Sequence, residues 1–283
     1  MDHIDEFESI FRRADKATFE FHPPQWNRVA LITDYGSEQQ EQLKQEVIQY
    51  LPMLSSKSEF FLLGENDFQN VVELLDLLRS KSVDLIITFR HLREKEHIPQ
   101  HSLGVYIDVL TQTVPAPVLL MPGSAVAPKS LAEMRCEDVM VVTEQIAGDH
   151  RLVNYGAACA PAGGQLFLVH IEDDIVFERY MQVIEQIPEI DSSIAREQID
   201  HQLLQDALDY QQSCEEAIKS ARDQLMVYSI ARRGHRLRDI QSLIDEQNVD
   251  LLVMNTKDDD QLAMHGLAYS LSVELQELPL LLV

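Results

Sequence analysis

The sequence predicts an α/β protein built from two tandem open sheets of the five-stranded type, each mostly parallel and flanked by helices. Short aliphatic runs alternate with helix-periodic segments along most of the chain, a pattern typical of βαβ units. The stretch Gly104–Met121 is also echoed by Gly266–Val283. In both, a glycine opens a helix-compatible segment, a proline follows thirteen residues later, and an aliphatic run comes next.

The first half contains four apolar runs bounded by turn residues, which indicate buried parallel strands. These strands are expected at Val29–Thr33, Phe60–Leu63, Asp84–Thr88 and Val118–Met121. Helices are expected after the first strand to about Leu54, over a stripe from Val71 to Leu78, and over Gly104–Thr113. A polar loop is expected between the third strand and the last helix.

The second half repeats this order with one addition. Its strands are expected at Val139–Thr143, Gln165–Ile171, Leu225–Ile230, Asp250–Met254 and Leu280–Val283, with helices at Asp149–Ala160, Arg236–Glu246 and from Gly266. The long segment Asp173–Arg222 carries a helix-periodic apolar face and has no counterpart in the first half. The first half is therefore expected to lack one βα unit.

The chain divides into four predicted segments. Residues 1–26 form an N-terminal extension with an amphipathic start, residues 27–122 the shortened first domain, residues 123–137 a linker with Pro and small residues, and residues 138–283 the second domain.

Composition narrows the classes of function. The formal net charge of −24 disfavours nucleic acid and anionic membrane surfaces as partners. Three dispersed cysteines, without CxxC spacing, suit a reducing cytoplasm, and the helix-periodic Cys214 is expected in the core. No signal-peptide pattern and no apolar run long enough for a membrane span occurs in the sequence. A cytoplasmic location is expected.

Several motifs, taken in order, resemble the universal stress protein family, here as a tandem pair. They are Leu31–Ser37 at the first strand and turn, Gln165–Ile171 at the second strand, Arg233–His235 with Ile240 at the third turn, Asp250–Met254 at the fourth strand, and the two Gly-to-Pro endings. The resemblance implies an adenine nucleotide alpha hydrolase-like fold, a role in stress response, and repeats packed as an internal pseudo-dimer.

One class of that family binds ATP through a Gly-x2-Gly-x9-Gly-Ser/Thr loop after the fourth strand. In the second half, Asn255 and Asp258 stand at the first two glycine positions, and Leu267 replaces Ser/Thr after Gly266. In the first half, Phe89 and Leu92 replace these glycines and Val105 follows Gly104. The acidic run Asp258–Asp260 would repel a triphosphate, at about 4 kcal/mol per close charge pair for an effective dielectric constant of about 20. Ordinary ATP binding is therefore not expected, and no cofactor is assigned.

A ligand, if one binds, is expected at the carboxyl ends of the strands. The candidate pocket residues are Thr143, Glu144, His170, Asn255, Thr256 and Gly266 in the second half, and Thr33, Asp34 and Gly104 in the first. Asp34 matches the family position that meets adenine, and Glu144 is its counterpart. For both, a turn or helix-capping role is the favoured interpretation.

Metal and catalytic sites were weighed at three places. His170 with Glu172 and Asp173, the spaced set His91, His97 and His101, and the run Asp258–Asp260 all carry ligand-type side chains. A satisfied histidine, an exposed titrating loop and a solvated acidic loop are the favoured interpretations. No GxSxG, GxGxxG, P-loop or HExxH pattern occurs in the sequence, so neither a metal nor an enzyme is expected.

The leading hypothesis is a universal-stress-type protein that acts through protein contacts or self-association. The aliphatic runs Val118–Met121 and Leu280–Val283 are expected to pair between the repeats, because strand edges need cover. Chain pairs are expected to assemble through Met1–Phe21 or Asp173–Arg222, giving a homodimer. Two alternatives stay open, which are a nucleotide or small-ligand sensor (ATP or AMP) in the second domain, and a metal enzyme at His170 or Asp258–Asp260.

Overall fold

The fold was analysed in a computed structural model of the chain. It describes residues 18–54, 58–94, 102–122, 130–143, 146, 148–256, 264 and 266–283. Glu144, His97, His101 and Asp258–Asp260 lie outside these residues, as does most of the N-terminal extension.

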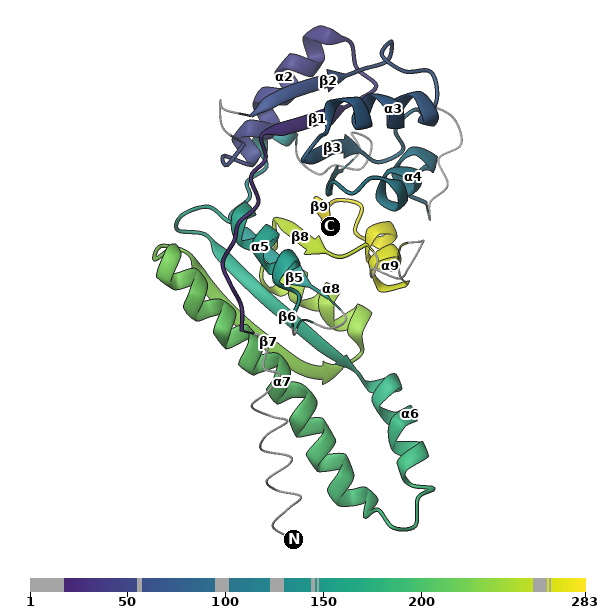
Figure 1. The fold of residues 1–283 in the computed structure, drawn as a ribbon, viewed down its shortest axis with the longest axis vertical. Helices are drawn as coiled ribbons and strands as arrows, with labels where there is room; N and C mark the ends of the chain where they lie inside the picture. The colour runs from purple at the N-terminus through teal and green to yellow at the C-terminus, as the bar shows by residue number, and fades with distance from the viewer. Residues whose placement is uncertain are drawn as a thin grey trace.

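The described residues form one nine-stranded sheet with helices on both faces (Figure 1). The strands are β1 (Arg28–Ile32), β2 (Glu59–Leu63), β3 (Leu85–Phe89), β4 (Val118–Met121), β5 (Asp138–Val142), β6 (Gln165–Asp173), β7 (Met226–Gly234), β8 (Leu251–Met254) and β9 (Leu280–Leu282). Their order in the sheet is β2-β1-β3-β4-β9-β8-β5-β6-β7. Every neighbouring pair is parallel except β4 and β9.

The helices follow the strands in the predicted alternation. They are α2 (Ser37–Tyr50), α3 (Val71–Lys81), α4 (Val105–Thr113), α5 (His150–Cys159), α6 (Asp174–Ile184), α7 (Ser192–Ala221), α8 (Arg236–Glu246) and α9 (Gly266–Glu274), with the 3₁₀ turn η1 (Leu131–Glu133) before β5. The predicted α/β class with a mostly parallel sheet is confirmed. The two predicted sheets are halves of a single sheet, because β4 and β9 pair across them.

The predicted difference between the halves is also present. Only α3 connects β2 to β3, whereas α6, α7, β7 and α8 lie between β6 and β8. In Figure 1, α6 and the lower part of α7 form a hairpin that extends beyond the end of the sheet. None of the helices in the described residues has the length and apolar character needed to cross a bilayer.

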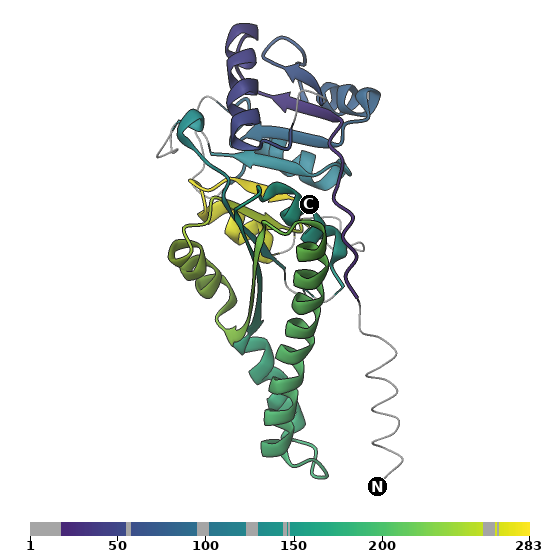
Figure 2. The ribbon, with the colours of Figure 1, turned by 90° about the vertical axis from the view of Figure 1, so that its left-hand side faces the viewer.

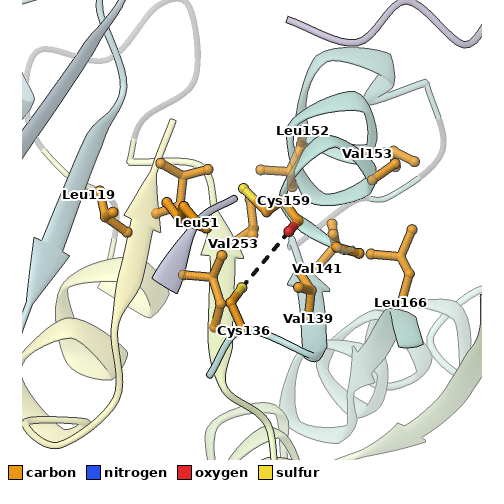
Figure 3. Packing of buried hydrophobic residues seen from close by; sticks show 14 of the residues in the cluster. Leu51, Leu119, Cys136, Val139, Val141, Leu152, Val153, Cys159, Leu166 and Val253 are labelled. Carbon is orange, nitrogen blue, oxygen red and sulfur yellow. Dashed lines mark hydrogen bonds between the residues drawn. The ribbon is translucent and has the colours of Figure 1, made fainter. Parts of the chain in front are cut away.

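Alternation along the strands divides the core between the two faces of the sheet. Val29 and Leu31 belong to one buried cluster, whereas Ala30 and Ile32 belong to the other. The first cluster is continuous across both halves. Figure 3 shows Leu51 and Leu119 of the first half near Cys136, which precedes β5, and near Val253 of the second half.

The start of the described chain lies against the second half before it enters β1 (Figure 1). The Phe19 ring packs edge-on against Tyr210 of α7 at a centroid distance of 6.4 Å. The backbone N–H of His22 donates to Asn154 Oδ1 at 2.7 Å, and Trp26 stacks on Tyr155 at 5.9 Å. Residues from Phe19 to Trp26 therefore connect the two halves on one face.

Two strands and one arginine also connect the halves where they meet. The pairing of β4 with β9 sets Val118 opposite Leu282 and Leu120 opposite Leu280. Arg90, which follows β3, is buried and donates from its guanidinium to the carbonyl oxygens of Ser272 and Leu275 at the end of α9, the second at 2.7 Å. Burial lowers the pKa of Arg90 to about 10, so the side chain is charged at neutral pH. Its charge suits the negative end of the α9 dipole.

We predict that Arg90→Met lowers the free energy of unfolding by about 2–4 kcal/mol, since buried carbonyls lose charged donors. Urea denaturation would measure the change. The control is Arg79→Met, which removes an exposed pair with Asp76 and is expected to change stability by less than about 1 kcal/mol. Equal effects of the two substitutions would show that Arg90 does not hold the halves together.

Candidate functional site

The described candidate pocket residues lie within or after parallel strands, or at the starts of the helices α4 and α9. Thr33 and Asp34 follow β1, and Gly104 precedes α4. Thr143 follows β5, His170 lies within β6, Asn255 and Thr256 follow β8, and Gly266 opens α9. The hydrogen bonds of these residues show how each half fills the space at the ends of its strands.

In the first half, Asp34 is bound by the loop after β3. The backbone N–H of Arg93 donates to both Asp34 carboxylate oxygens, at 3.2 and 3.1 Å, and the Arg93 guanidinium lies 3.6 Å from Oδ1. Of the turn and helix-capping roles expected for Asp34, the capping role is wrong, because Gly36 is the N-cap residue of α2 and no side chain of the described residues caps that helix. Asp34 lies in the bend between β1 and α2. Sequence spacing alone could not reveal this contact, because its partners are 59 residues apart.

The Arg93 side chain then fills the space beside Asp34. Its Nη2 donates to the carbonyl oxygens of Gly64, Glu65 and Phe68 at 3.0, 2.7 and 3.1 Å. The guanidinium also lies 4.3 Å from the centroid of the Phe68 ring. The Arg93 backbone has a left-handed φ of 68°, a conformation that non-glycine residues seldom adopt. The contacts of the Arg93 guanidinium hold the loop after β3 in this conformation.

A second residue of this loop, Glu94, occupies the start of α4. Its Oε1 accepts from the backbone N–H of Val105 at 2.9 Å, and its Oε2 lies 3.0 Å from His91 Nδ1. Gly104 has a φ of 96°, and a Cβ there would lie 3.2 Å from the Glu94 carboxyl group. A helix N-terminus is the usual place for a bound phosphate. Here the protein supplies its own carboxylate at that place.

In the second half, Asn255 is paired with Asp149. The Asn255 amide donates to Asp149 Oδ2, and Asp149 Oδ1 accepts from the backbone N–H of Leu152 at 3.0 Å, which caps α5. Burial raises the pKa of Asp149, and the hydrogen bonds from Leu152 and Asn255 offset part of that effect. A carboxylate therefore lies next to the first position of the altered glycine loop. Thr256 donates to the Val283 carbonyl at 3.1 Å and so contributes to holding β9.

Among the histidine candidates, the structure describes the surroundings of His170 but not those of His97 or His101. His170 is buried, its Nε2 lies 3.4 Å from Glu172 Oε2, and its Nδ1 has no hydrogen-bond partner among the described residues. The expectation of a satisfied histidine is therefore not met at Nδ1. Asp173 is not beside it as a ligand, since its carboxylate caps α6 through Ile175 and Val176. Within the described residues, no group of three or more His, Cys, Asp or Glu side chains is placed to hold a metal.

Two cavities near α5 were not anticipated from the sequence. The first, of about 590 Å³, lies between α5 and the extended residues 18–24. The second, of about 280 Å³, lies between the halves and is lined in part by Thr256. Arg151 lines both cavities. Its guanidinium lies 5.7 Å from the Tyr155 ring centroid, and the described residues place no carboxylate at ion-pair distance from it. No sequence pattern marks Arg151 as a residue that lines a cavity.

The three cysteines are free and buried. Burial raises the pKa of Cys214 to about 12 and raises that of Cys136 and Cys159 as well. All three are therefore protonated at neutral pH and unsuited to nucleophilic attack. The prediction that Cys214 belongs to the core is confirmed by its place beside α7 core residues.

Comparison with known proteins gives structural likenesses only. No family model and no curated protein matches the chain. A functionally unknown protein of Pseudomonas aeruginosa is similar over 91% of this chain and 92% of its own, at 12% identity and a TM-score of 0.47. A universal stress protein of Archaeoglobus fulgidus is similar over 87% of this chain and 76% of its own, at 14% identity and a TM-score of 0.47.

At these identities and TM-scores, the likeness to solved structures, a universal stress protein among them, assigns no ligand and no role to any residue of this chain.

We predict opposite pH dependences for two helix-capping aspartates. The pKa of Asp149 is raised in the folded state, so its contribution to stability falls as pH rises from about 4 through the folded pKa. Asp149→Asn should therefore gain stability relative to the wild type as pH rises. Asparagine keeps an oxygen for capping α5.

Asp191, the N-cap residue of α7, provides the control. Hydrogen bonds from Ser193 and Ile194 lower its pKa, so its contribution grows as pH rises to about 4 and is lost in acid. Asp191→Asn should lose stability relative to the wild type over that range. Urea midpoints measured from acid to neutral pH would test both substitutions. Parallel curves for Asp149→Asn and the wild type would contradict the assignment for Asp149.

Proposed function

We propose that the protein is a universal-stress-type protein that does not bind ATP in the usual way and acts through protein contacts in a stress response. The role proposed is not enzymatic. One observation carries the proposal, namely that the Glu94 carboxylate already caps the N-terminus of α4. A phosphate at that site would have to displace Glu94 or lie beside its negative charge.

The surroundings of Glu94 support the same conclusion. Arg93 fills the neighbouring space with three carbonyl contacts, and Asp34 is bound by the Arg93 backbone. In the second half, the half-buried Asp149 carboxylate pairs with Asn255, where the resemblance would place a glycine. Each half thus has an acidic side chain of its own beside a position where the resemblance would place phosphate-binding backbone. The three free, buried cysteines also suit the reducing cytoplasm, which we propose as the location.

A second function, a sensor that binds a small ligand through the second half, is favoured by Arg151. This side chain lines two cavities, and one of them includes the candidate residue Thr256. Within the described residues, Arg151 donates to the Pro115 carbonyl at 3.5 Å and forms no ion pair with a carboxylate. An arginine that is not paired with a carboxylate of the protein can donate hydrogen bonds to a carboxylate or phosphate of a ligand.

Calorimetry with ATP at up to millimolar concentration, with and without magnesium, distinguishes these functions. We expect no saturable heat from the wild-type protein, because Glu94 caps α4 in the first half and Asp149 lies beside Asn255 in the second, so each would repel a phosphate. Saturable binding would overturn the leading proposal.

If saturable heat is seen, Arg151→Ala assigns it. Loss of binding in Arg151→Ala, with binding kept in the exposed Arg179→Ala on α6, would place the ligand at the cavities beside α5. Binding that survives both substitutions would contradict the leading function and would place the ligand away from Arg151.

A further inference from the structure

The α6–α7 hairpin carries a group of exposed apolar side chains near its tip. In Figure 2, as in Figure 1, the tip lies beyond the sheet. Thirteen large apolar side chains are exposed in the described residues, and six of them fall within the 20 residues from Ile175 to Ile194. Scattered apolar residues are normal on a protein surface, but a concentration of them marks an interaction site. We call five of the six the hairpin patch, namely Tyr180, Val183, Ile187, Ile190 and Ile194.

The packing of α6 against the rest of the protein leaves this patch uncovered. Phe177 is the buried anchor of α6, and its ring centroid lies 5.7 Å from the Arg196 guanidinium of α7 and 4.4 Å from that of Arg233 of β7. These contacts fix which side of α6 faces the protein. Tyr180 and Val183 lie on another side of the helix and are 62% and 59% exposed.

The exposed side of α6 has the spacing of a helix-packing seam. Val176, Tyr180, Val183 and Ile187 follow one another at intervals of four, three and four residues, which is the repeat of coiled-coil contact positions. Ile187 lies beyond the end of α6, but its backbone N–H donates to the Ile184 carbonyl at 3.0 Å, so the turn continues to it. A seam with this spacing fits the apolar stripe of another helix.

The hairpin is acidic even after its ion pairs are taken into account. Residues 174–206 contain eight carboxylates and two arginines. Four of the carboxylates are in ion pairs within the protein, namely Glu178 and Glu185 with Arg196, and Asp174 and Asp200 with Arg233.

The other four carboxylates are exposed, and no described residue forms an ion pair with them. They are Glu189, Asp191, Glu197 and Asp206. Glu189 and Glu197 flank the patch residues Ile190 and Ile194 along the chain. The second arginine of the hairpin, Arg179, is exposed as well. The apolar patch is therefore bordered by more free negative than positive charge.

We propose that the hairpin patch binds a basic amphipathic helix of a partner protein. The seam on α6 fits a helix, and the free carboxylates complement lysine or arginine beside its apolar stripe. A second copy of this chain would instead bring the same carboxylates to the interface, and residues 174–206 contain no lysine to oppose them. This inference rests on the proposed function, which is action through protein contacts, and names the surface and the class of partner.

A synthetic peptide tests the proposal on the full chain. The probe is a fluorescently labelled peptide of about 18 residues, long enough for a helix of about 27 Å, with leucine at coiled-coil contact positions and lysine elsewhere. Its fluorescence anisotropy should show saturable binding in the micromolar range at physiological ionic strength. The same peptide with glutamate in place of lysine should not bind, because its charges oppose those of the hairpin.

A pair of substitutions locates the binding. Val183→Lys should weaken binding of the lysine peptide about 10-fold, because a cation replaces an apolar contact and faces a basic helix. Val72→Lys is the matched control and should bind like the wild type, since Val72 on α3 is 62% exposed and far from the hairpin. Circular dichroism and urea denaturation would verify that both variants fold.

Several results would overturn the proposal. They are the absence of binding by the lysine peptide, equal binding of the glutamate peptide, and equal effects of Val183→Lys and Val72→Lys. A wild-type dimer that Val183→Lys dissociates in sedimentation would assign the patch to a second copy instead. Binding that appears only after Phe7→Asp and Phe11→Asp would assign it to the amphipathic start of this chain, which lies outside the described residues.

Failure of this inference is distinguishable from failure of the proposed function. If ATP gives no saturable heat and the lysine peptide does not bind, the hairpin patch is not the contact surface and the proposed function stands. If ATP binds saturably, the proposed function is overturned whatever the peptide does.

Discussion

The antiparallel pairing of β4 with β9 is the constraint on which the rest of the structure depends. Each half alone would expose an aliphatic strand with unpaired backbone groups, and their pairing removes both edges. It also makes one buried cluster continuous across the halves, so that side chains such as Leu119 and Val253 share a core. Arg90 strengthens the same junction from the side by binding the end of α9.

Much of this architecture could be predicted from the sequence, because its causes are local and periodic. Aliphatic runs such as Val139–Val142 and turn residues between them give strands in a buried parallel sheet. Repetition of the Gly-to-Pro ending indicated which strands are equivalent, and hence which edges would need each other. The extra unit of the second half followed from the unequal spacing of its strands. The domain limits and the homodimer remain predictions.

The contents of the candidate site could not be predicted in the same way. Asp34 lies 59 residues from Arg93, and Asn255 lies 106 residues from Asp149, so spacing carries no signal for either contact. The altered glycine positions showed how the loops differ from the family pattern. They did not show that Glu94 contacts the start of α4 or that Arg93 binds the Gly64 carbonyl, since a charged loop residue has the same pattern whether it faces solvent or folds inward. Side-chain direction in such loops is decided by tertiary contacts.

The place of β9 in the sheet has a consequence for how the chain is assembled. β9 is the ninth strand along the sequence, yet it is the fifth across the sheet, between β4 and β8. During synthesis, β1 to β4 emerge long before the strand that covers β4, so the first half must wait with an open edge. The nascent protein is therefore most exposed to wrong pairing in the interval before residues 280–282 appear. A chaperone that shields β4 during this interval would act on the step that completes the sheet.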